Sequence, residues 1–91
     1  MKTIMAFYLN GCPYCANAKK AVEELTRENA AYQSIDLTWY EETEHADLLP
    51  AHPYTYVPNM FVDDEKRYEA HPGEMYDETK AKIKAVFDSV L

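Results

Sequence analysis

Glycine, cysteine and positive charge are all scarce in this chain of 91 residues. The two glycines each follow a turn-forming residue, and the two cysteines lie only three positions apart. A framework of disulfides therefore cannot hold the fold together, and a packed core must do so. The hydrophobic fraction of 47% is sufficient for such a core. A chain of this length predicts a single domain, 1–91.

Nine basic residues stand against 16 acidic ones, so the net charge is −7. This charge repels phosphate backbones and anionic headgroups, which argues against nucleic acid and membrane partners. The chain has no run of the ~18–20 apolar residues that span a membrane. Its first apolar stretch is too short for a signal peptide and ends at Asn10-Gly11 without a cleavage site. We therefore expect a soluble, cytoplasmic protein that acts as a monomer.

Apolar spacing predicts alternating strands and helices. Ala18, Ala21, Val22 and Leu25 follow the i, i+3, i+4, i+7 pattern of a buried helix face, with Lys19 on the opposite, polar face. The expected elements are a strand over 3–9, a helix from Cys12, a strand over 31–37, a helix from Thr38 to Pro50, strands over 59–62 and 65–69, and a helix over 75–91.

Two local signals set boundaries within this pattern. Thr38 and Glu41 have the spacing of a capping box, which predicts the start of the second helix. Asp63-Asp64 predicts the turn of a hairpin. The resulting order, β-α-β-α-β-β-α, belongs to the α/β class. It predicts a four-stranded mixed sheet with helices on both faces.

The motif Cys12-Pro13-Tyr14-Cys15 follows the first predicted strand and holds both cysteines. Cys12 suits the N-cap of a helix, and Pro13 suits its first position, where the missing N–H is not needed. Thiols at i and i+3 lie on one helix face and can close a small disulfide. Backbone N–H groups at a helix start favour a thiolate, so the motif predicts a redox centre.

Metal binding is the main alternative use of these cysteines. A zinc site needs four ligands, and the sequence has no second Cys-x-x-Cys pair. The three histidines, His45, His52 and His71, are scattered along the chain. We therefore predict no metal site. A non-catalytic module that holds a metal or an iron–sulfur cluster through Cys12 and Cys15 stays open as a different class of function.

The chain resembles dithiol glutaredoxins of the thioredoxin-like superfamily. The resemblance rests on Gly11 followed by Cys-Pro-Tyr-Cys, on Val57-Pro58 directly before a short strand, and on the element order. It implies a thiol–disulfide oxidoreductase in which Cys12 attacks and Cys15 resolves. It also implies a cis Pro58, no bound cofactor, glutathione as co-substrate and disulfide-bearing proteins as substrates. The implied substrate-binding residues are Pro13, Tyr14, Tyr56, Val57 and Pro58.

Three departures from the family pattern surround the motif. Leu9 stands where the family usually has Lys or Arg, and Tyr56 stands where it has Thr before Val-Pro. The segment 67–74 replaces the family's Gly-Gly pair and the following Ser/Thr-Asp. Two electron donors therefore stay open. One is glutathione, and the other is a flavin reductase that supports a redoxin with one specific protein partner.

Overall fold

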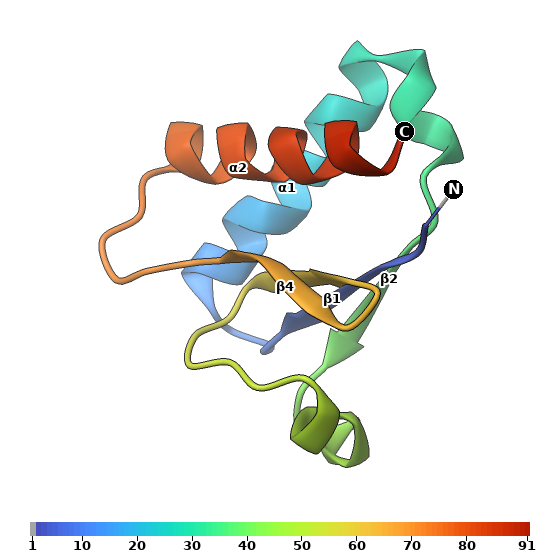
Figure 1. Ribbon diagram of the computed structural model, residues 1–91. Helices are drawn as coiled ribbons and strands as arrows, with labels where there is room; N and C mark the ends of the chain where they lie inside the picture. Colours follow the sequence, from blue (N-terminus) through green and yellow to red (C-terminus); the bar gives the residue numbers. More distant parts are fainter. Residues whose placement is uncertain (1) are drawn as a thin grey trace.

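The computed structural model describes residues 2–91, which form two α-helices, two 3-10 helices and one sheet (Figure 1). In chain order the elements are β1 (Ile4–Tyr8), α1 (Pro13–Glu28), the 3-10 helix η1 (Ala30–Ser34), β2 (Leu37–Glu41), the 3-10 helix η2 (Ala46–Ala51), β3 (Asn59–Val62), β4 (Glu65–Glu69) and α2 (Tyr76–Val90).

Strand β1 lies inside the sheet, whose order over residues 2–91 is β2-β1-β3-β4. It pairs in parallel with β2, where Ala6 faces Trp39, and antiparallel with β3, where Ala6 faces Met60. Strands β3 and β4 form the predicted hairpin. Its turn residues Asp63 and Asp64 have φ angles of 52° and 62°, as a two-residue hairpin turn requires. The mixed four-stranded sheet predicted from the sequence is confirmed.

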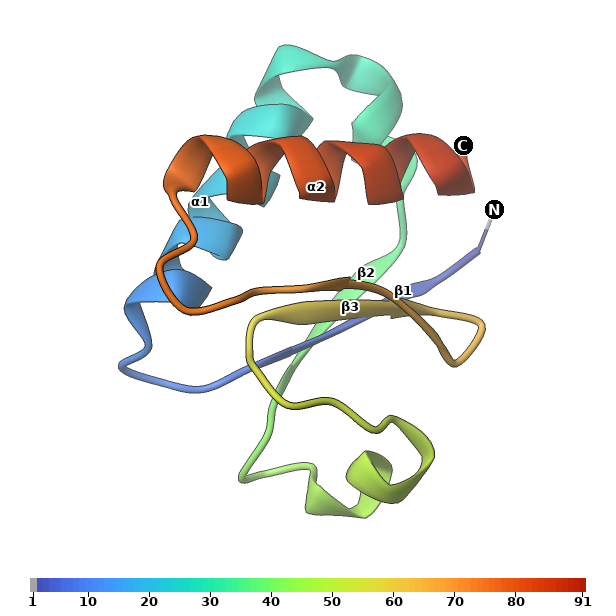
Figure 2. The same cartoon turned by 60° about the vertical axis from the view of Figure 1, so that its left-hand side comes forward.

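Both α-helices cover the same face of the sheet (Figures 1 and 2). They pack on Ile4 and Ala6 of β1, which are fully buried. The small side chains of Ala18 and Ala21 let α1 approach the sheet closely, since protein interiors are packed without large gaps. Other members of this core are Leu25, Tyr32, Met60, Val62, Tyr68, Ala70, Ile83, Val86, Phe87 and Val90.

Aromatic rings close the opposite face of the sheet. The buried ring of Phe7 has four aromatic neighbours, with centroids 5.4 Å away for Tyr54, 5.6 Å for His52, 5.7 Å for Tyr40 and 5.9 Å for Phe61. Helix η2 and the loop after it lie on this side of the sheet (Figures 1 and 2). Helices therefore lie on both faces of the sheet, with two α-helices on one face and a short 3-10 helix on the other.

The strand predicted over 31–37 is wrong, because most of that segment is η1. Asn29 starts this 3-10 helix by accepting, through Oδ1, a hydrogen bond from the N–H two residues later. The ring of Tyr32 is buried and packs edge-on against Phe87 of α2, with centroids 5.3 Å apart. Packing on a distant helix thus overrides the local preference for a strand, and β2 begins only at Leu37.

The α-helix predicted from Thr38 to Pro50 is also wrong. The residues of the supposed capping box form β2, because threonine and aromatic side chains favour a strand that can pair with β1. Glu41 does not cap a helix at Thr38, and its carboxylate instead accepts the Thr43 N–H at 2.7 Å. Only η2 remains of the expected helix, and Pro50 lies inside it.

The other predicted elements are confirmed, with boundaries that differ by one residue or not at all. Helix α1 has Cys12 as its N-cap, and α2 has Met75 as its N-cap. No helix within residues 2–91 is long and apolar enough to cross a membrane.

The packing of aromatic rings on the second face of the sheet predicts that Phe61→Ala destabilises the protein by about 3–5 kcal/mol, because the substitution leaves a cavity among buried rings. Phe61 is 2% exposed and contacts Phe7 and His52. Urea denaturation measures the change in unfolding free energy. Tyr56→Ala is the control, since its ring is 45% exposed, and should stay within about 0.5 kcal/mol of the parent. A loss below about 1 kcal/mol at Phe61 would contradict this account of the second face.

Candidate active site

Helix α1 begins at the cysteine motif, as the sequence predicts. Cys12 is the N-cap and Pro13 is the first helical residue. Gly11 makes the preceding turn at φ +82°, a conformation that residues with a side chain rarely adopt. The Sγ atom of Cys12 accepts a hydrogen bond from the Cys15 N–H at 3.3 Å. The first turn of the helix therefore presents a donor to this sulfur.

The two thiols are free and lie in different environments. Cys12 is half-buried, whereas Cys15 is 2% exposed. Burial, followed by the hydrogen bond with Cys12, raises the pKa of Cys15 to about 12. The charge of Lys19 acts in the opposite direction with a smaller effect. Cys15 is therefore a protonated thiol at neutral pH, and Cys12 is the sulfur that reaches solvent.

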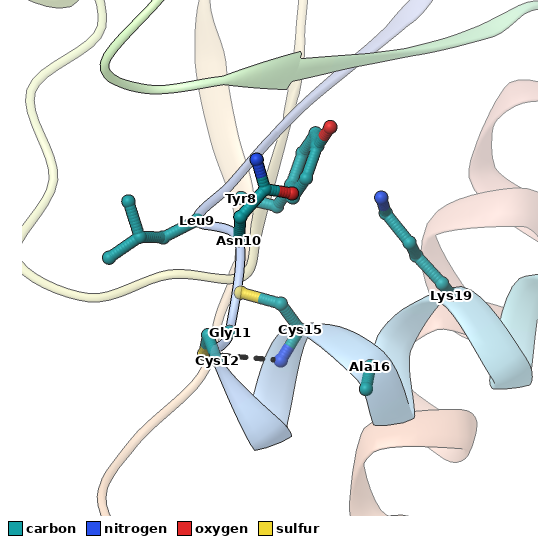
Figure 3. A pocket seen from close by; sticks show the side chains of 8 residues that line it. All are labelled: Tyr8, Leu9, Asn10, Gly11, Cys12, Cys15, Ala16 and Lys19. Atoms are coloured by element: carbon teal, nitrogen blue, oxygen red, sulfur yellow. Dashed lines mark hydrogen bonds between the residues drawn. The ribbon is translucent and has the colours of Figure 1, made fainter.

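A pocket of about 140 Å³ lies beside the cysteines, between the end of β1 and the start of α1 (Figure 3). The ammonium group of Lys19 extends over the Tyr8 ring, 3.5 Å from its centroid. Sequence reasoning placed Lys19 on a polar helix face and missed this position, because Tyr8 belongs to a different element. The pocket is lined by Tyr8, Leu9, Asn10, Gly11, Cys12, Cys15, Ala16 and Lys19.

Glu41 anchors the turn that precedes the motif. This residue is 4% exposed, and Oε2 accepts the Asn10 N–H at 3.1 Å. Its other oxygen accepts the N–H and the hydroxyl of Thr43 at 2.7 Å and 2.6 Å. The Thr43 hydroxyl and these N–H groups lower the pKa of the Glu41 carboxyl. The end of β2 thus positions the loop that leads to Cys12, a role that sequence reasoning missed.

The Val57-Pro58 peptide bond is cis, as predicted. Because β1 and β3 are antiparallel, with Phe7 opposite Asn59, the residues before β3 lie at the sheet end where β1 leads into the motif. No hydrogen bond within residues 2–91 involves the backbone N–H or carbonyl of Val57. The ring of Tyr56 is 45% exposed. The predicted substrate residues around Pro58 therefore share one end of the sheet with the cysteines.

Two contacts tie the segment 67–74 to this end of the sheet. The Tyr14 hydroxyl accepts the Gly73 N–H at 2.7 Å. Glu69 Oε2 accepts the Tyr56 N–H at 2.8 Å and the N–H of the preceding residue at 2.6 Å. The segment in which the sequence departs from the glutaredoxin pattern thus contacts both the cysteine motif and the loop before Pro58.

Metal-ligating side chains gather in the loop before α2 and in its first turn. Within residues 2–91, the one set of three such side chains close enough to share an ion is His71, Glu74 and Glu78. Neither Cys12 nor Cys15 belongs to it. Sequence reasoning missed this set because it tested His71 only against other histidines and cysteines, and not against carboxylates.

Comparison with known proteins gives the same family as the motif. The glutaredoxin family model matches residues 3–66. Glutaredoxin 1 of Escherichia coli (strain K12) is 35% identical over 68 residues, which cover 71% of this chain and 79% of the relative. The chain belongs to the glutaredoxin family. It is a glutaredoxin-like thiol–disulfide oxidoreductase, as the resemblance implies.

Solved structures confirm the thioredoxin-like fold. The structure of E. coli glutaredoxin aligns with a TM-score of 0.55 and 24% identity, covering 94% of this chain and 98% of that one. A structure described as that of a malarial protein aligns with a TM-score of 0.64 and 13% identity, covering 93% and 96%. The sequence match to the family ends at residue 66, directly before the divergent segment 67–74.

The lowered pKa of Glu41 predicts a pH-dependent effect of Glu41→Gln on thermal stability. A carboxyl whose folded pKa lies below its unfolded value of about 4.3 stabilises the fold above that pH. This contribution is lost as the pH falls through the folded pKa. We expect a lower Tm than the parent at pH 7 and convergence of the two in acid, measured by circular dichroism. Glu44→Gln, at an exposed position of the same turn, is the control. A Tm difference independent of pH would contradict this role of the charge.

The unequal thiols predict selective alkylation. Iodoacetamide at pH 8 should attach to Cys12 of the reduced protein and leave Cys15 unmodified, since burial keeps Cys15 protonated. Intact mass and peptide mapping measure the sites. Denatured protein, in which both thiols are exposed, is the control and should take two groups. Modification of Cys15 first would show that the environments are assigned the wrong way round.

Proposed function

We propose that Cys12 is the attacking sulfur and Cys15 the resolving sulfur of a dithiol mechanism. The Cys12 thiolate attacks one sulfur of a substrate disulfide, which breaks that bond and releases one substrate thiolate. Cys15 then attacks Cys12 in the mixed disulfide and releases the second thiolate. Its proton passes to a released thiolate. The substrate gains two electrons, and a Cys12–Cys15 disulfide forms.

The observation that carries this assignment is the asymmetry of the pair. The Cys15 N–H donates to Cys12 Sγ at 3.3 Å, and a negative sulfur gains more from such a donor than a neutral one. The helix dipole acts in the same sense. Cys15 is buried and protonated, so it is protected from substrate until the mixed disulfide forms beside it.

We assign substrate binding to Pro13, Tyr14, Tyr56, Val57 and Pro58. Within residues 2–91 the backbone N–H and carbonyl of Val57 have no partner, which supports this proposal because an extended substrate can pair with them as a strand does. The exposed ring of Tyr56 offers an apolar surface next to that segment. Tyr14 lies inside the motif, with its hydroxyl held by Gly73.

Glutathione is the electron donor that we propose, by analogy with the family. A flavin reductase is the second candidate, and specific observations favour it. Leu9 lines the pocket where the family usually has a basic residue, so that position offers no cation to a carboxylate of glutathione, and Lys19 is the cation that lines the pocket instead. The carboxylate of Glu69 already accepts hydrogen bonds from the two backbone N–H groups that precede Val57. Lys66 pairs with that carboxylate at 2.8 Å.

The substrates, the oligomeric state and the cellular location that we propose follow from the same thiol–disulfide chemistry. We propose disulfide-bearing proteins or glutathione mixed disulfides as substrates, with no bound cofactor. The protein would act as a monomer, in one domain, in the cytoplasm, where thiols are kept reduced. With a net charge of −7, nucleic acids and anionic membranes are not expected partners.

Single substitutions of the two cysteines test the assignment. Cys12→Ser should abolish reduction of every disulfide substrate. Cys15→Ser should abolish reduction of protein disulfides yet retain reduction of a small glutathione mixed disulfide, because glutathione can resolve the intermediate in place of Cys15. Turnover is measured with glutathione plus glutathione reductase, and in parallel with a thioredoxin-reductase system.

The two donor systems separate the two candidates. Turnover with glutathione alone supports the first, and turnover with the flavin reductase alone supports the second. Equal loss of mixed-disulfide reduction in Cys12→Ser and Cys15→Ser would contradict the division of roles. Ala81→Ser, a change of similar size at an exposed position of α2 away from the pocket, is the control and should retain activity.

A further inference from the structure

The loop between β4 and α2, together with the first turn of α2, brings one imidazole and two carboxylates together. His71 Nε2 lies 2.6 Å from Glu78 Oε2 and 3.7 Å from Glu74 Oε1. The three ligand atoms all lie within 4.8 Å of one another. Two of the residues belong to the segment 67–74, and the family match ends before that segment.

Glu74 gives this cluster a feature that a surface ion-pair network lacks. Its side chain is fully buried, and Oε2 accepts hydrogen bonds from the hydroxyls of Tyr68 at 2.5 Å and Thr79 at 2.6 Å. Its other oxygen, Oε1, has no hydrogen-bond partner within residues 2–91. A buried carboxylate oxygen without a partner is unfavourable. This oxygen lies 3.7 Å from both His71 Nε2 and Lys82 Nζ, beyond hydrogen-bond distance, so the cluster contains a buried carboxylate oxygen that no hydrogen bond uses.

The imidazole is oriented as a ligand as well. His71 Nδ1 lies 3.0 Å from the carbonyl oxygen of Pro72, and since a carbonyl only accepts, Nδ1 carries a proton. Nε2 points at the two carboxylates, and since the Glu78 carboxylate also only accepts, Nε2 carries a proton that must leave before this atom binds an ion. Ligating histidines commonly donate their other ring N–H to a backbone carbonyl in this way. The hydroxyls of Tyr68 and Thr79 orient Glu74 in the same manner.

We propose that His71 Nε2, Glu74 Oε1 and Glu78 Oε2 bind a divalent transition-metal ion, with Zn²⁺ as the reference ion. One imidazole and two carboxylates suit Zn²⁺, and water completes a tetrahedral set. Ligands at ~2.1 Å from such an ion lie roughly 3.4 Å apart. His71 and Glu74 already have about this separation, at 3.7 Å, whereas His71 and Glu78 lie closer, at 2.6 Å, and must move apart when an ion enters. Both His71 and Glu78 are exposed enough to adjust, at 48% and 40%.

Lys82 is the competitor for this position. Its ammonium lies 2.7 Å from Glu78 Oε2 and 3.7 Å from Glu74 Oε1, on a side chain that is 43% exposed. A lysine stem is flexible, so the ammonium can move into solvent when an ion enters. A site for Zn²⁺ predicts that loss of Lys82 strengthens metal binding, whereas a pure ion-pair network predicts only a loss of stability.

The site would bear on the cysteine motif through the loop itself. Gly73, between two of the ligands, donates its N–H to the Tyr14 hydroxyl at 2.7 Å. The Glu74 N–H donates to the His71 carbonyl at 3.0 Å, so the loop is already turned in the conformation that gathers the ligands. A bound ion would hold this loop, and with it the contact to Tyr14.

The test uses the full chain with Cys12→Ser and Cys15→Ser, so that thiolates cannot bind the ion. Calorimetric titration with Zn²⁺ and visible spectroscopy with Co²⁺ should give one ion per chain. Adding His71→Ala or Glu78→Gln should weaken binding at least about tenfold. His45→Ala and Glu23→Gln, at positions outside the cluster, are matched controls and should leave the affinity unchanged. Lys82→Met should bind the ion more tightly.

Absence of stoichiometric Zn²⁺ binding in this chain would overturn the proposal. So would an affinity that neither His71→Ala nor Glu78→Gln lowers, or that Lys82→Met fails to raise. Circular dichroism of each variant shows that it is folded, so a lost site is separated from a lost fold. Because both cysteines are absent, the result does not depend on the proposed redox mechanism.

Discussion

Burial of β1 on both faces is the constraint on which the rest of the structure depends. Ile4 and Ala6 face the two α-helices, and Phe7 faces the aromatic cluster, with all three fully buried. Apolar area removed from water stabilises by about 25 cal/mol per Å², so a strand covered on both sides is strongly fixed in register. Its parallel pairing with β2 and antiparallel pairing with β3 then decide which loops meet. The cysteine motif and the loop before Pro58 lie at the same end of the sheet because one follows β1 and the other precedes β3.

Buried and half-buried carboxylates organise the loops at and near this end of the sheet. Glu41 accepts the Asn10 N–H and the Thr43 N–H, so both of its oxygens have partners. Glu69 holds the backbone before Val57 in the same way. Glu74 differs, because only one of its oxygens is satisfied within residues 2–91. The first two carboxylates hold loop positions by hydrogen bonds, whereas the second oxygen of Glu74 has only the charged groups of His71 and Lys82 near it, each at 3.7 Å.

Local signals predicted those parts of the fold that local interactions decide. The N-cap at Cys12, the Asp63-Asp64 turn and the periodicity of α2 are all set within a few residues of the chain, and the structure confirms them. The region between α1 and β3 was predicted wrongly. Tyr32 is held by Phe87 of α2, and the residues of β2 by pairing with β1. The spacing of residues along the sequence does not indicate those distant partners.

The same distinction applies to the site. The cysteines and the cis Pro58 were predictable because each lies in a short motif. Two other positions could not be predicted, because they depend on contacts between different elements. Lys19 lies over Tyr8, and Glu41 accepts the Asn10 N–H.

Dithiol exchange needs little more than a helix start and two sulfurs in unequal environments, and residues 3–66 retain both. The identity of the reductant depends on what surrounds Cys12, which includes the segment 67–74. That segment reaches the motif through the Gly73 contact with Tyr14 and the loop before Pro58 through Glu69. Under the proposed assignment of Cys12, changes in the segment can alter access to the attacking sulfur while the reaction at that sulfur stays the same. The chain then keeps the cysteine motif of its family and departs from the family pattern in the segment that contacts this motif.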